Sequence, residues 1–197
     1  GKPLKDFLDV RNHSEAIDLL YDFIAQNRPL SESFIKEINA LLLYGIKSTP
    51  ALDQFGQRTQ KTAHPGRYKL DSNSVLQLDG TMHYYVEPEQ VPAQMAFLVN
   101  WIHQFNSVHP IVKAALAHYN MVRIHPFDDG NGRGARLLMI CLLIQAGYPP
   151  AIIRSEERRK YIQVINQADQ GELAPFVEYI GQSLLQTEDT VLAILEE

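Results

Sequence analysis

The chain has 197 residues, of which 45% are hydrophobic and 21% charged. This length suits a single domain, since domains commonly have about 100–200 residues, and the composition is typical of a globular protein. It excludes a disordered segment, a coiled coil and collagen. Lys and Arg total 18 and Asp and Glu total 23, for a formal net charge of −5. That balance argues against a nucleic-acid partner, because neutralising a phosphate backbone requires a basic surface.

The single cysteine, Cys141, lies in the apolar run 137–144. One cysteine excludes an internal disulfide and a cysteine-based zinc site, so we expect a small buried residue in a reducing compartment. The apolar run is too short to cross a bilayer, and no signal-like segment opens the chain. The sequence therefore predicts a cytoplasmic domain without a membrane anchor. The chain does not begin with Met, so we expect a fragment of a longer polypeptide.

Helical periodicity dominates the sequence. The expected helices begin at Asn12, whose spacing to Glu15 fits a capping box, at Pro29 to Ser31, after Pro92, at Pro110, near Gly132, at Ser155 and near Leu173. We expect N-terminal helices over 12–45, a core over about 90–170 and a C-terminal helix over 173–196.

Two segments do not follow the helical pattern. Residues 74–86 contain VLQL, then Asp79-Gly80, then TMHYYV, a pattern typical of a short β-hairpin with a glycine turn. Residues 53–68 are polar and contain glycine, which predicts a long loop. The expected fold class is therefore all-α, a single domain over 1–197 with one short β-hairpin.

One segment, HPFDDGNGRGAR at 125–136, has the features of an anion-binding loop. Glycines allow backbone amides to approach a ligand, and the following helix turns the positive end of its dipole to the same place. Arg133 and Arg136 lie one helical turn apart at that end, where a polyphosphate would offset their charge. The alternative to a phosphate site is that these arginines bind no ligand and only pair with Asp128 and Asp129.

Within this segment, two residues have side chains suited to catalysis. Asp129 offers carboxylate oxygens for Mg²⁺ beside a phosphate site, whereas we expect Asp128 to point to solvent or to a helix cap. His125 has an ordinary pKa near neutrality and can serve as a general base. Because it precedes Pro126, we expect an extended backbone at His125.

The segment resembles the signature of the Fic domain family: HPF, any residue, Asp or Glu, GNGR, two residues, Arg. Every specified position is filled here, by His125, Pro126, Phe127, Asp129, Gly130, Asn131, Gly132, Arg133 and Arg136. The resemblance extends outwards, from NHSEAIDLL near the start to YIQVINQADQGELAPFVEYI near the end, and so covers nearly the whole chain.

The resemblance implies a Fic-fold helical bundle and a protein adenylyltransferase, which transfers AMP from ATP to a Tyr, Thr or Ser hydroxyl of a target protein and releases pyrophosphate. It makes His125 the catalytic base and Asp129 the ligand of Mg²⁺ or Mn²⁺. It assigns the nucleotide phosphates to Asp129, Gly130, Asn131, Gly132, Arg133, Gly134 and Arg136. It assigns the adenine pocket to Tyr161, Ile162 and Asp169, and the target-binding flap to Leu78, Asp79, Gly80 and Thr81 of the hairpin.

Other relatives leave alternatives open. Some members of this superfamily transfer phosphoryl, UMP or phosphocholine groups, and a non-catalytic nucleotide-binding or toxin–antitoxin module is a further alternative. Gly132 favours AMP transfer, because phosphorylating Doc-type loops have lysine there. The family's inhibitory motif, Ser or Thr, three residues, Glu, then Gly or Asn, is absent from these 197 residues, so we expect a fragment without its inhibitory helix. The expected partners are ATP and a target protein, with a homodimer as an alternative to a monomer.

Overall fold

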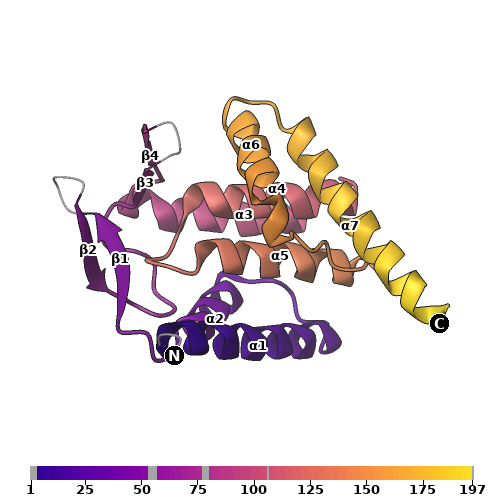
Figure 1. The fold of residues 1–197 in the computed structure, drawn as a ribbon, viewed down its shortest axis with the longest axis horizontal. Helices are drawn as coiled ribbons and strands as arrows, with labels where there is room; N and C mark the ends of the chain where they lie inside the picture. The colour runs from indigo at the N-terminus through magenta and orange to yellow at the C-terminus, as the bar shows by residue number, and fades with distance from the viewer. Residues whose placement is uncertain (1–3, 53–56, 77–79, 106, 197) are drawn as a thin grey trace.

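A computed structural model describes residues 4–52, 57–76, 80–105 and 107–196 (Figure 1). The described part contains α-helices and two short antiparallel sheets of two strands each. The helices are α1 (Leu4–Ala25), α2 (Glu32–Leu42), α3 (Val91–Gln104), α4 (Pro110–Ile124), α5 (Asn131–Gln145), α6 (Arg158–Asp169) and α7 (Ala174–Leu195), with short 3₁₀ turns η1 (Pro88–Gln90) and η2 (Ser155–Glu157). The strands are β1 (Ser48–Leu52), β2 (Arg58–Thr62), β3 (Ser74–Leu76) and β4 (Met82–Tyr84). The predicted all-α fold class is confirmed.

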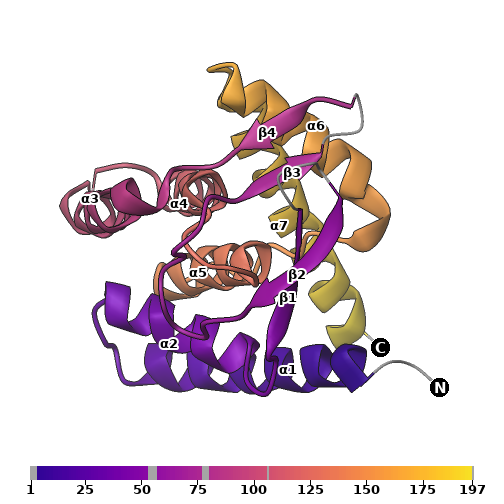
Figure 2. The ribbon, with the colours of Figure 1, turned by 90° about the vertical axis from the view of Figure 1, so that its left-hand side faces the viewer.

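Helix α5 lies at the centre of the bundle, as Figure 2 shows. It packs along α4 on one side and against α1 and α2 on the other, while α3 covers the outer side of α4 and α7 packs on α4 and α6. The C-terminal part of α7 extends away from the body (Figure 1). The loop between α4 and α5 therefore joins two central helices and is held by the core on both sides.

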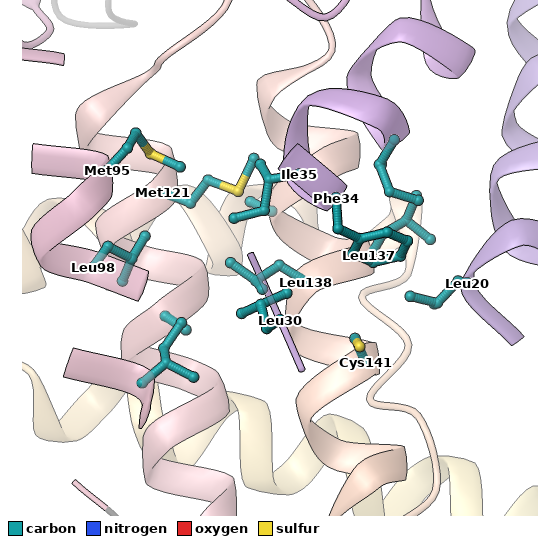
Figure 3. Close-up of a cluster of buried hydrophobic side chains, with 14 of the residues drawn as sticks. Leu20, Leu30, Phe34, Ile35, Met95, Leu98, Met121, Leu137, Leu138 and Cys141 are labelled. Atoms are coloured by element: carbon teal, nitrogen blue, oxygen red, sulfur yellow. The ribbon is translucent and has the colours of Figure 1, made fainter. Parts of the chain in front are cut away.

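Two clusters of buried apolar side chains form that core. The larger cluster joins α1, α2, α3, α4 and α5, and Figure 3 shows Leu137, Leu138 and Cys141 of α5 among its members. Cys141 is fully buried, as predicted, and burial raises the pKa of its thiol to about 12. No helix in the described ranges combines the length and the hydrophobicity that a membrane crossing requires.

The helix starts agree with the sequence in most cases. Ser31 caps α2, since its Oγ accepts a hydrogen bond from Phe34 N at 3.2 Å, and Pro110 opens α4 as expected. The predicted start of the first helix at Asn12 is wrong, because α1 already begins at Leu4. Asn12 is buried inside that helix, and its Nδ2 donates to the carbonyl oxygens of Leu42 and Tyr44 at the end of α2. In the sequence alone, a buried Asn that binds the end of a neighbouring helix cannot be told from an Asn that caps its own helix.

Ser155 is also not the cap of α6. It opens the 3₁₀ turn η2, and α6 begins three residues later at Arg158 without a side-chain cap. The hydroxyl of Ser155 instead donates to the carboxylate of Glu156.

The expected hairpin is present, and a second one was missed. Strands β3 and β4 pair with Val75 opposite His83, which confirms the prediction for 74–86, although Leu78 and Asp79 at its turn lie outside the described residues. The predicted loop over 53–68 is wrong in part, because β2 lies within it and pairs with β1, with Ala51 opposite Thr59. The sequence of β2, RTQKT, has no apolar alternation, so its pairing could not be predicted from hydrophobic periodicity.

Candidate functional site

Residues 125–136 connect the end of α4 to the start of α5. His125 is the C-cap of α4, with φ 50° and ψ 58°, and its N–H donates to the carbonyl oxygen of Met121. The expectation of an extended backbone at His125 was wrong: the left-handed closure of a helix end prevails over the preference set by Pro126. Such a conformation is unusual for a residue with a Cβ, and strain of this kind is found preferentially at functional sites.

The loop after His125 is fixed by amide side chains. Asn131 is buried, its Oδ1 accepts from Phe127 N at 2.9 Å, and its Nδ2 donates to Phe127 O at 2.8 Å. From α2, the buried Asn39 donates to Asp129 O at 3.0 Å and accepts from Gly66 N at 3.0 Å. The Asn131 side chain is therefore engaged within the loop, and its backbone N–H is one of the free donors at the start of α5.

Gly130 is the N-cap of α5 and requires a left-handed backbone, with φ 76°. A Cβ at this position would lie 3.2 Å from Nδ2 of Asn39. Glycine therefore satisfies both the turn and the close approach of α2.

The two arginines lie at the N-terminal end of α5, side by side and only partly exposed. Nη1 of Arg133 lies 2.6 Å from Oδ1 of Asp9 on α1, and its Nη2 lies 4.0 Å from Oδ1 of Asp129. Around Arg136, no carboxylate in the described ranges comes within ion-pair distance. Burial and the nearby charge of Arg133 lower the pKa of Arg136, because both disfavour its charged form. An anion bound here would therefore offset the free-energy cost of burying this charge.

The imidazole of His125 is enclosed by the β3–β4 hairpin. The ring of Tyr85 stacks on it, with centroids 3.7 Å apart, and Nδ1 of His125 lies 3.2 Å from Val122 O. A bond to that carbonyl requires hydrogen on Nδ1, which leaves Nε2 as the neutral acceptor. Burial lowers the pKa of His125 to about 4, and the charges of Lys69, His83 and Lys61 act in the same direction. The imidazole is therefore neutral at pH 7, as a general base must be.

Asp128 does not point to solvent or to a helix cap, and this part of the prediction was wrong. Its side chain is 2% exposed, with Oδ1 2.9 Å from Lys61 Nζ on β2 and Oδ2 2.8 Å from Nδ1 of His64. The backbone N–H of His64 also donates to Oδ2 at 3.1 Å. Burial raises the pKa of Asp128, but the hydrogen bonds from Lys61 and His64 outweigh that effect and leave it below its ordinary value.

Lys61 also joins the two hairpins. Its Nζ lies 2.8 Å from Oδ1 of Asn73, just before β3, and Nδ2 of Asn73 donates to Phe127 O at 2.9 Å. Asp128, Lys61 and Asn73 thus fasten both hairpins to the loop between α4 and α5. Of the alternative in which the arginines pair with Asp128 and Asp129, the Asp128 part is wrong, while Arg133 does lie 4.0 Å from Asp129.

Asp129 is the one predicted metal ligand. Its Oδ1 accepts from Gly130 N at 2.6 Å, at the head of the anion-binding loop. Among the described residues, no three His, Cys, Asp or Glu side chains are grouped so as to hold a metal ion. A single carboxylate beside a phosphate site suits Mg²⁺, which commonly uses one or two carboxylates together with phosphate oxygens and water.

The predicted adenine-pocket residues lie on α6. The hydroxyl of Tyr161 lies 2.9 Å from Nε2 of the buried His118 on α4. Asp169 accepts a hydrogen bond from the Tyr119 hydroxyl at 2.9 Å, and Arg123 Nε lies 3.6 Å from the same oxygen. These contacts show that both side chains have protein partners, while Ile162 is partly exposed on the same helix. Of the predicted flap, Gly80 and Thr81 are described and lie at the turn before β4, with a left-handed backbone at Gly80.

Six residues around the loop were missed by the sequence analysis: Asp9, Asn39, Lys61, His64, Asn73 and Tyr85. Asn39 could have been identified from the sequence, because it is a polar residue between Ile38 and Leu42 on the apolar face of α2, and a buried amide needs hydrogen-bond partners. The others come from segments far from the loop in sequence, so only the tertiary fold reveals their positions.

Comparison with known proteins shows the family and the fold of the chain. The model of the Fic/DOC family matches residues 29–143. The protein adenylyltransferase Fic of Nematostella vectensis is 39% identical over 166 residues, which are 81% of this chain and 38% of that protein. The protein of the same name from Drosophila grimshawi is 46% identical over 107 residues, 51% of this chain and 22% of that protein. The chain thus spans well under half the length of these relatives.

A solved structure shows the same fold. A Fic-domain-containing signaling protein from Bacteroides thetaiotaomicron is 33% identical, with a TM-score of 0.81 over 94% of this chain and 71% of that one.

Proposed function

The chain belongs to the Fic/DOC family, and on that premise we propose that it transfers AMP from ATP to a hydroxyl group of a target protein and releases pyrophosphate. The observation that carries the proposal is the pair Arg133 and Arg136 at the N-terminal end of α5, in the same segment as a neutral, half-buried His125. Paired guanidinium groups, helix N–H groups and a glycine turn suit a polyphosphate, and a neutral imidazole suits the removal of a hydroxyl proton.

The proposed reaction uses the chain's residues as follows. Nε2 of His125 accepts the proton of the target hydroxyl, whose oxygen forms a bond to the α-phosphorus of ATP. The bond from that phosphorus to the bridging oxygen of pyrophosphate breaks, and pyrophosphate leaves with the electron pair. The amides of Gly130, Asn131 and Gly132 stabilise the charge on the transferred group, and Arg133 and Arg136 hold the β- and γ-phosphates.

We propose that a divalent cation, Mg²⁺ or Mn²⁺, binds through Asp129 and the phosphates. Such an ion neutralises charge on the phosphate oxygens when it is bound. The position of the Asp129 carboxylate at the head of the loop supports this assignment, because the phosphates would supply the other ligands. Tyr161, Ile162 and Asp169 are proposed for the adenine base, and Gly80 and Thr81 for target binding. A cytoplasmic location and a homodimer stay predictions from the sequence.

The test uses ATP labelled at either the α- or the γ-phosphate, with Mg²⁺ and a cell lysate. We expect label on protein from α-labelled ATP only, and its loss in His125→Ala. Label from γ-labelled ATP only would replace AMP transfer by phosphorylation, and equal labelling by wild type and His125→Ala would remove His125 from the reaction. Unchanged ATP affinity in the variant is the control that its nucleotide site is intact.

A further inference from the structure

A cleft of about 500 Å³ lies on the target side of His125, between the two hairpins. It is lined by residues of β1 and β2, by segment 71–75, and by Tyr85, His125, Asp128 and Asp129. Its described lining includes Asp129 but neither Arg133 nor Arg136, so it adjoins the place proposed for the phosphates at Asp129. Its volume is within the range of about 300–1,000 Å³ that is usual for ligand pockets.

The β1–β2 sheet turns one defined face to this cleft. Residues opposite each other in an antiparallel pair share a face, so Ala51 and Thr59 lie together, and so do Thr49 and Lys61. Lys61 reaches the catalytic loop through Asp128, which identifies this face as the inner one. Gln60 and Ser48 lie on the other face, where they form an exposed hydrogen bond of 2.6 Å. The inner wall therefore presents two small side chains, Ala51 and Thr59, to the cleft, and Pro50, next to Ala51 on β1, also lines it.

The opposite wall is β3, and its pairing leaves main-chain groups available. Tyr85 N donates to Asn73 O at 3.2 Å, so these two residues form a hydrogen-bonded pair of the ladder. Because the pattern alternates, the N–H and C=O of the next residue, Ser74, point away from β4. Val75 shares the face of Asn73 that turns to the catalytic loop, and it is 43% exposed.

The charges of the cleft favour a basic occupant. Lys61 and Asp128 neutralise each other, and Asp129 belongs to the proposed phosphate site. Asp71, which is exposed at the rim, is the remaining carboxylate among the described lining residues. Lys69, whose Nζ lies 6.0 Å from the centre of the Tyr85 ring, offsets part of the negative charge near His125, so the acidic part of the cleft is its rim at Asp71.

We propose that the β1–β2 hairpin is the second wall of the target-binding cleft: an extended, hydroxyl-bearing segment of the target binds between this hairpin and β3, with a basic side chain toward Asp71. This inference rests on the proposed AMP transfer. Ala51 and Thr59 then limit the size of a target side chain next to the modified hydroxyl, and Asp128 positions this wall through Lys61 without touching the target.

The test compares Thr59→Tyr with Gln60→Tyr, which place the same bulky side chain on the inner and the outer face of one strand. Tyrosine is well accepted in strands, so thermal melts should show both variants folded. The acceptor is a degenerate library of eleven-residue peptides with a central Tyr, Thr or Ser, and the donor is α-labelled ATP. We expect labelling at least tenfold slower in Thr59→Tyr and within twofold of wild type in Gln60→Tyr, with ATP affinity unchanged in both. Peptides with Lys beside the hydroxyl should be labelled faster than those with Glu, and Asp71→Lys should reverse this order.

Equal labelling by wild type, Thr59→Tyr and Gln60→Tyr would overturn the role of the β1–β2 hairpin in target binding. If wild type labels lysate proteins from α-labelled ATP but none of the peptides, binding of an extended segment is wrong while AMP transfer stands. If no acceptor of either kind takes the α-label, the proposed function itself fails. These outcomes separate the two proposals.

Discussion

The ring of Tyr85 lies nearly parallel to the imidazole of His125, with 19° between their planes and 3.7 Å between their centroids. The stacked phenol covers one side of the proposed base and shields that side from water. This contact couples the position of the β3–β4 hairpin to the protonation of His125.

The first prediction concerns the pH dependence of activity. With the pKa of His125 lowered to about 4, mainly by burial, the imidazole loses its proton well below its ordinary pKa near 6.5. We expect the acidic limb of kcat/KM for AMP transfer to lie well below pH 6.5, because the neutral form exists above the lowered pKa. In Tyr85→Ala the ring becomes hydrated, and the limb should move up toward 6.5. Tyr84→Ala, which removes an exposed ring from the neighbouring position, should leave it in place. A wild-type limb near 6.5 would contradict the prediction.

The second prediction concerns Asp9 and its ion pair with Arg133. The carboxylate orients the guanidinium but also repels a nearby triphosphate. Asp9→Asn keeps a hydrogen-bond acceptor and removes the charge, so ATP should bind two- to fivefold more tightly, about 0.5–1 kcal/mol. Asp9→Ala also removes the acceptor and should not share this gain. Calorimetric Kd values decide the matter, with the exposed Asp6→Asn on the same helix as control. Weaker binding in Asp9→Asn would show that its charge does not oppose the nucleotide.

The third prediction concerns the buried carboxylate of Asp128. Asp128→Asn leaves the ammonium of Lys61 beside a neutral amide, and loss of one partner of a buried pair is costly. We expect the free energy of unfolding in urea to fall by about 2–4 kcal/mol. Asp71→Asn, on the exposed rim, should change it by less than about 0.5 kcal/mol. Equal stabilities of the two variants would show that the contacts of Asp128 contribute little.

The fourth prediction separates the two reasons for glycine at position 130. Gly130 and Gly147 both have a left-handed backbone, with φ 76° and 83°, but only at Gly130 would a Cβ meet another side chain, Asn39. Gly147→Ala should therefore cost about 1–2 kcal/mol of stability and leave ATP affinity unchanged. Gly130→Ala should cost more and weaken ATP binding at least tenfold, because its neighbours supply the amides of the anion site. Unchanged ATP affinity in Gly130→Ala would contradict this role.

The sequence predicted the helices and marked the segment 125–136 as the candidate site because both depend on local patterns. Apolar periodicity, Ser31 as a cap and the run 125–136 each carry their information within a few residues. The contacts that brace the loop do not, since Asn39, Asn73 and Lys61 reach it from residues 54 to 90 positions away. The lysine at 61 bonds to Asp128 only because β1 and β2 pair, and that pairing has no hydrophobic signal.

Two errors share a physical origin. Asn12 and His125 were interpreted from short-range rules, a capping-box spacing and the residue-before-proline preference. In the folded chain both are governed by helix ends: Asn12 binds the end of α2, and His125 closes α4. The free energy of satisfying helix-terminal groups exceeds the local preference in each case.

The burial of Cys141 makes the chain a convenient host for site-specific probes. It is the single thiol in the sequence, and with no exposed surface and a pKa of about 12 it should react with maleimides only after unfolding. A cysteine introduced at Gly80 or Gln60 could then carry a fluorophore without prior removal of the native one. Each hairpin would thus acquire its own reporter, while modification of the native thiol would count the molecules that have unfolded.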